Sequence, residues 1–192
     1  MHPTRFALAP QIFYFTPQNQ WYLVFQSGPP MYSTNDDVGN PAGWTQASPF
    51  FSGVPAIVQD DAGNGVWLDF KVICDAANCY LFFTGDNGNF YRSQTTIGNF
   101  PSGFSDPVIV MSNPTAGQLF EASDVYSMTG TGRYLALVEA FDADSNYHRF
   151  YKSWTADALD GTWTPAARLA HRDPLTARSR SRPCCPRFTG WL

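Results

Sequence analysis

The chain repeats one pattern three times, with a period of about 60 residues. Each copy has an apolar run, a polar turn, an aromatic-led run, an aromatic residue followed closely by serine, and then a glycine near an aromatic. The landmarks of the copies are Ser33, Ser93 and Ser153, and Trp44, Phe104 and Trp163. The serines lie 60 and 60 residues apart, and the aromatics lie 60 and 59 residues apart. A fixed period of strand-like runs and polar turns is typical of a β-propeller with one four-stranded sheet, or blade, in each repeat.

The sequence therefore predicts an all-β fold, with about three blades of a partial propeller over residues 1–167. A complete propeller usually has roughly four to eight blades. Hydrophobic residues make up 44% of the chain, enough to fill cores between sheets, and charged residues make up only 15%. No long stretch of the predicted propeller has the composition of a disordered segment.

Residues 168–192 differ from the rest of the chain. They carry six arginines and one aspartate, a net charge of +5, whereas residues 1–167 carry −9. This segment has no strand pattern, and we interpret it as an irregular basic tail of the kind that an out-of-frame reading would produce. The acidic body argues against nucleic acid as a partner, because binding phosphates requires a face of Lys and Arg.

The predicted location depends on the N-terminus and the cysteines. The first ten residues lack the apolar stretch of about 7–15 residues that a signal peptide needs, and no segment approaches the ~18 apolar residues of a membrane span. Cys74 and Cys79 flank a four-residue turn, which predicts a cross-strand disulfide, the alternative being two buried thiols. A disulfide would imply an extracellular parent protein. We expect a monomer that has no membrane partner.

Two carboxylates are the candidate catalytic groups. Asp69 and Glu121 each start an apolar run at the same place in successive copies. In a hairpin, the start of the first strand neighbours the end of the second, which brings Asp69 near 84–87 and Glu121 near Glu139. The first strand is the innermost of a blade, so both carboxylates are predicted to line the central pocket. The alternative is that both only cap strands or accept backbone hydrogen bonds.

Paired carboxylates suit glycoside hydrolysis, which needs one protonated acid and one ionised partner. Glu121 lies between Phe120 and Ala122, an apolar setting that would keep its carboxyl protonated near neutral pH. Asp69 could reinforce this state by repulsion between like charges.

Three polar residues are candidate contacts to sugar hydroxyls from the same edge of the blades: Gln26, Asp86 and Asn87. The alternative is that they only form turns, as polar loop residues commonly do.

Several long motifs resemble one known family. The stretches APQIFYFTPQNQWYLVFQ, LFEASDVYSM and FYKSWTADALDGTWTP are similar to glycoside hydrolase family 62, and the resemblance covers about residues 6–167. It implies a five-bladed β-propeller and a secreted α-L-arabinofuranosidase that removes arabinose side groups from arabinoxylan, or from arabinoxylo-oligosaccharides, with inversion.

The resemblance also implies roles for the two carboxylates. Glu121 in LFEA would be the general acid, and Asp69 would adjust the pKa of that acid and orient the substrate. The family's catalytic base is an aspartate upstream of the matched segment, so we expect impaired hydrolysis from this chain. The alternative function is a non-catalytic glycan-binding propeller that keeps Asp69 and Glu121 as sugar contacts.

The family implies no certain cofactor. A central structural cation is possible in the complete fold, associated with a histidine of the fifth blade. His148 and His171 lack ligand-like spacing to another histidine or carboxylate, so we predict no metal ligand in this chain.

Overall fold

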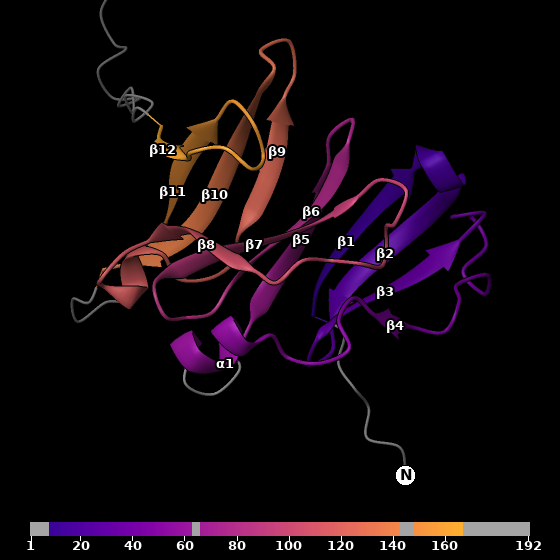
Figure 1. Ribbon diagram of the computed structural model, residues 1–192, viewed down its shortest axis with the longest axis horizontal. Helices are drawn as coiled ribbons and strands as arrows, with labels where there is room; N and C mark the ends of the chain where they lie inside the picture. Colours follow the sequence, from indigo (N-terminus) through magenta and orange to yellow (C-terminus); the bar gives the residue numbers. More distant parts are fainter. Residues whose placement is uncertain (1–7, 63–65, 143–147, 167–192) are drawn as a thin grey trace, which may run out of the picture.

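The computed structural model describes residues 8–62, 66–142 and 148–166. The described strands form three antiparallel four-stranded sheets, which lie side by side with the middle one between the other two (Figure 1). This confirms the prediction of an all-β fold with about three blades. The predicted basic tail at 168–192 lies outside the described residues.

Each sheet follows the chain without a crossover. The first blade has β1 (Leu8–Phe15), β2 (Gln20–Gln26), β3 (Pro30–Asn35) and β4 (Ser48–Pro49). The second blade has β5 (Leu68–Cys74), β6 (Asn78–Thr84), β7 (Asn89–Thr96) and β8 (Val108–Ser112). The third blade has β9 (Asp124–Met128), β10 (Arg133–Phe141), β11 (Arg149–Ala156) and β12 (Thr164–Pro165).

The described helices are short: α1 (Ala56–Ala62), η1 (Thr16–Gln18) and η2 (Ala116–Gln118). Within the described ranges, no helix is long and apolar enough to cross a membrane.

Strand β6 shows why the middle blade is buried on both faces. Side chains alternate between the faces of a strand, and here both faces are apolar. Leu81 and Phe83 pack into the core shared with the first blade, whereas Tyr80 and Phe82 pack into the core shared with the third blade. A strand covered on both sides reads as one continuous apolar run, which is how CYLFF looks in the sequence.

Tight turns close the innermost hairpins. Asp75 Oδ1 accepts hydrogen bonds from the backbone N–H groups of Ala77 and Asn78, at 2.8 and 2.8 Å, the usual role of aspartate in a turn. The cysteines on either side of this turn, Cys74 and Cys79, are joined by a disulfide, with Cα atoms 4.0 Å apart. The disulfide lies at the opposite end of the β5–β6 hairpin from Asp69.

A β-bulge recurs where the innermost strands of the first and second blades begin. The register of the β1–β2 pair shifts between Leu8 and Gln11, and that of the β5–β6 pair shifts between Leu68 and Lys71. One residue near the start of each innermost strand has a left-handed backbone: Ala9 (φ 46°), Asp69 (φ 57°) and Ala122 (φ 49°).

The register also corrects the repeat alignment. The Glu139 N–H donates to the Glu121 carbonyl, so Glu121 lies opposite Glu139 as Leu68 lies opposite Thr84 in the second blade. Glu121 is therefore equivalent to Leu68, and Ala122 is equivalent to Asp69. The two candidate carboxylates occupy adjacent positions of the bulge rather than the same position.

Candidate active site

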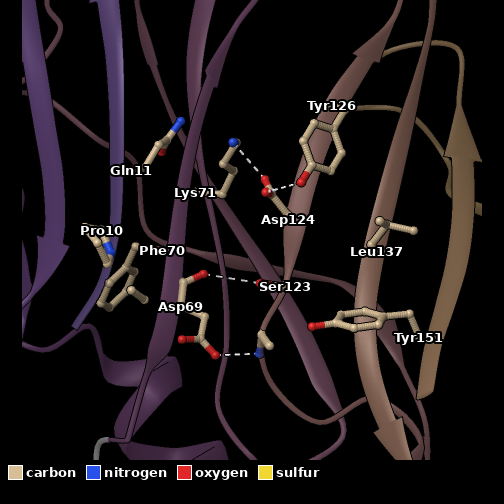
Figure 2. Close-up of a pocket in the computed structure, with 12 residues that line it drawn as sticks. Pro10, Gln11, Asp69, Phe70, Lys71, Ser123, Asp124, Tyr126, Leu137 and Tyr151 are labelled. Carbon is tan, nitrogen blue, oxygen red and sulfur yellow. Dashed lines mark hydrogen bonds and ion pairs between the residues drawn. The ribbon is translucent and has the colours of Figure 1, made fainter. Parts of the chain in front are cut away.

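The innermost strands meet around a cavity of about 400 Å³ (Figure 2). Its lining residues are Ala9, Pro10, Gln11, Asp69, Phe70, Lys71, Ala122, Ser123, Asp124, Tyr126, Leu137 and Tyr151. Asp69 therefore lies where the hairpin geometry predicts. Glu121 is not among the lining residues, although the next residue, Ala122, is.

Asp69 connects all three blades. Its Oδ2 accepts a hydrogen bond from the Ala122 N–H at 2.5 Å, and its carbonyl oxygen accepts one from the Ser123 hydroxyl at 3.3 Å (Figure 2). Its own N–H donates to Gln26 Oε1 of the first blade at 3.4 Å. The carboxylate is thus fixed against the residue that follows Glu121.

The surroundings of Asp69 raise the pKa of its carboxyl group above the ordinary value. Burial is the largest influence on the pKa of Asp69 and raises it, while the hydrogen bond from Ala122 lowers it. The negative charges of Glu121 and Glu139 add to the upward shift, and the net direction of the pKa is upward.

Glu121 is held by an arginine that the sequence analysis missed. Arg149 Nη1 donates to Glu121 Oε1 at 2.9 Å and to Glu139 Oε2 at 2.7 Å. The side chains of Glu121 and Glu139 are 29% and 12% exposed. The expected apolar setting of Glu121 is therefore only partly present, because the β10–β11 hairpin brings Arg149 back beside the end of β10.

Asp86 is influenced by the charges of the two candidate catalytic carboxylates, Asp69 and Glu121. It lies in the turn between β6 and β7, and its Oδ1 is buried with no hydrogen-bond partner among the described residues. Burial raises the pKa of Asp86 to about 6, helped by the charges of Glu121 and Asp69 and opposed by that of Arg149. Glu121 and Glu139 therefore share one arginine, and Asp69 and Asp86 lie close enough to Glu121 to interact with it electrostatically.

The other two predicted sugar contacts are already used within the protein. Gln26 Oε1 accepts the Asp69 N–H. Asn87 Oδ1 accepts the Asn89 N–H at 3.1 Å, and Asn87 Nδ2 donates to the Tyr91 hydroxyl at 2.7 Å. These bonds account for turn and blade structure, and contact with a sugar stays a prediction for Gln26, Asp86 and Asn87.

The described residues around the cavity do not fit a cation by themselves. Lys71 and Asp124 lie at equivalent positions of neighbouring blades and form an ion pair of 2.8 Å. The ammonium group of Lys71 satisfies that carboxylate and would repel a second cation. Within the described part of the chain, no group of three or more His, Cys, Asp or Glu side chains could hold a metal ion.

Comparisons with known proteins agree with the geometry. The model of Glycosyl hydrolase family 62 matches residues 3–184. Alpha-L-arabinofuranosidase C of Cellvibrio japonicus is 45% identical over 163 residues, which cover 83% of this chain and 24% of that protein. These matches confirm the resemblance inferred from the motifs.

Two solved structures are similarly close. The catalytic domain of a family 62 α-L-arabinofuranosidase from Coprinopsis cinerea is 49% identical, with a TM-score of 0.80, over 84% of this chain and 50% of that one. A family 62 hydrolase in complex with xylotriose is 43% identical, with a TM-score of 0.78, over 83% of this chain and 52% of that one. This chain spans about half the length of these solved relatives and about a quarter of the curated one.

Proposed function

This chain belongs to glycosyl hydrolase family 62, and from that premise we propose that it supplies the general acid of an α-L-arabinofuranosidase site and the carboxylate beside it. The reaction would release α-L-arabinofuranosyl side groups from arabinoxylan with inversion. One observation carries the assignment of the site: the hydrogen bond from the Ala122 N–H to Asp69 Oδ2. It holds Asp69, from the second blade, against the residue next to Glu121, from the third blade.

The proposed chemistry divides the work among carboxyl groups. Glu121 protonates the glycosidic oxygen as its bond to the anomeric carbon of arabinose breaks, so the xylan chain leaves as an uncharged alcohol while water attacks that carbon from the opposite face. Asp69 repels the ionised form of Glu121 and orients the sugar. We assign the general base, which activates the attacking water, to a carboxylate other than Asp69 and Glu121. A general base contributes about 10²- to 10⁴-fold to the rate.

Two observations support the substrate and the location. A family 62 relative is solved with xylotriose, a fragment of the xylan backbone to which arabinose side groups are attached, and this favours arabinoxylan as the polymer. The Cys74–Cys79 disulfide favours an extracellular protein, because disulfides persist in oxidising compartments.

The test is arabinose release by the full chain from arabinoxylan and arabinoxylo-oligosaccharides, measured by ion chromatography. We expect arabinose release that falls by about 10²-fold or more in Glu121→Gln. Proton NMR during the reaction should show the inverted anomer of arabinose appearing first. Asp157→Asn is the matched control, because Asp157 is an exposed carboxylate of the same blade, 88% exposed and paired with Arg133.

The results separate the two candidate functions. Equal release by the wild type and Glu121→Gln would rule out Glu121 as the acid. If the wild type binds an arabinoxylo-oligosaccharide without releasing arabinose, the alternative of a non-catalytic glycan-binding propeller replaces the enzyme proposal.

A further inference from the structure

The chain contains only two glutamates among its 16 acidic residues, Glu121 and Glu139. Both bind the same nitrogen atom, Nη1 of Arg149, at 2.9 and 2.7 Å. The proposed acid is therefore one half of a glutamate pair that shares an arginine.

Backbone pairing forces the two glutamates together. The Phe120 N–H donates to the Glu139 carbonyl at 2.9 Å, and the Glu139 N–H donates to the Glu121 carbonyl at 2.9 Å. Phe120 and Glu121 therefore both lie opposite Glu139, as two residues oppose one in a bulge, and both glutamate side chains reach the same nitrogen of Arg149. Two like charges this close are destabilising, and the shared guanidinium offsets their repulsion.

Packing holds the arginine in place. Its guanidinium lies over the ring of Phe120, 5.7 Å from the centroid. Phe120 in turn packs edge-on against Phe141, with centroids 4.8 Å apart, and Phe141 is the cross-strand partner of Arg149. A planar guanidinium braced on a ring loses less freedom when it bridges two carboxylates than a free one would.

We propose that Glu139 is a positioning residue for Glu121 and acts through Arg149. This inference rests on the proposed role of Glu121 as the acid. By taking part of the hydrogen-bonding capacity of Arg149, Glu139 prevents the arginine from stabilising the ionised form of Glu121 alone. Its own negative charge also disfavours a second charge on Glu121.

Other charged and titratable groups also face this pair. Asp69 approaches from β5 and Asp86 from the β6–β7 turn, and both interact electrostatically with Glu121. Tyr151 on β11 is the cross-strand partner of Glu139. Lys71 and Asp124 also line the cavity beside Asp69. They form an ion pair, so their charges largely cancel.

The direct test is titration of the two glutamate side chains by NMR. Selective labelling with ¹³Cδ-glutamate gives two carboxyl signals, because the full chain has two glutamates. In Glu139→Gln, we expect the half-titration point of Glu121 to fall by about one pH unit, because Arg149 then serves Glu121 alone. In Arg149→Gln, we expect it to rise by about as much, because two like charges remain face to face.

The controls separate a specific effect from a structural one. Arg133→Gln removes another arginine–carboxylate pair of the third blade, Arg133–Asp157, and should leave both signals unmoved. Arg149→Lys keeps the charge but loses the planar bridge, so its shift should be smaller than that of Arg149→Gln. Circular dichroism verifies that each variant is folded.

Opposite shifts in the Gln variants of Glu139 and Arg149 would establish the coupling. An unchanged Glu121 signal in folded Glu139→Gln would overturn the proposal, and this variant decides the matter even if an Arg149 variant does not fold. The titration needs no turnover, so its outcome is independent of the arabinose assay. If the two glutamate signals are coupled but no arabinose is released, the enzyme proposal is wrong and the coupling between Glu139 and Glu121 is still established.

Discussion

Asp86→Asn tests whether the carboxylates of this site oppose folding. Asp86 is half-buried, and its Oδ1 is buried with no hydrogen-bond partner among the described residues. Burial and the charges of Glu121 and Asp69 raise the pKa of Asp86 to about 6. Asparagine tolerates the left-handed backbone found here, φ 57°, so the substitution removes a charge with little added strain.

The sign and size of the effect follow from the pKa of Asp86, which is about 6 in the folded state and 3.8 as the ordinary value. The folded protein therefore holds a proton that the unfolded chain has lost between these pH values, and wild-type stability falls as pH rises through this window. A shift of about two pKa units corresponds to about 3 kcal/mol. Solvent around the site reduces this to about 1–2 kcal/mol.

We therefore expect Asp86→Asn to be about 1–2 kcal/mol more stable than wild type near neutral pH, and equally stable below about pH 4. Urea unfolding followed by tryptophan fluorescence at several pH values measures the difference. Asp157→Asn, at an 88% exposed carboxylate, should show no such dependence. A stability difference for Asp86→Asn that does not change with pH would refute the electrostatic reasoning.

Two further predictions concern the framework around the site. Asp69→Ala should be less stable than Asp69→Asn by about 1–3 kcal/mol, because alanine loses the hydrogen bond to the Ala122 N–H and is strained at φ 57°. Equal urea midpoints of these two variants would contradict this. Reducing the disulfide between Cys74 and Cys79, five residues apart in sequence, should cost about 2 kcal/mol of stability. It should leave the glutamate titration unchanged, which unfolding and NMR with and without a reductant would check.

The repeat made the blades and the place of Asp69 predictable, because strand and turn patterns recur along the chain. The bulge was not predictable, since nothing in LDF or FEA marks a left-handed residue. The repeat alone therefore predicted that Asp69 and Glu121 occupy equivalent positions, whereas in the structure Ala122 occupies the position equivalent to Asp69. The hairpin argument did predict that Glu139 neighbours Glu121. It missed Arg149, because the polar stretch between β10 and β11 has no alternation that fixes which residue returns to the strand end.

The repeated bulge explains how two blades direct carboxylates at one place. A bulge puts two residues opposite one and interrupts the alternation of side chains, so that Asp69, Phe70 and Lys71 in succession all line the cavity. In a regular strand, at most every second residue would do so. Left-handed alanines at Ala9 and Ala122 carry strain of roughly 1–3 kcal/mol each and persist only where their surroundings over-determine them. At Ala122 the hydrogen bond to Asp69 supplies that constraint, so the group that fixes the backbone beside the proposed acid is itself one of the site's carboxylates.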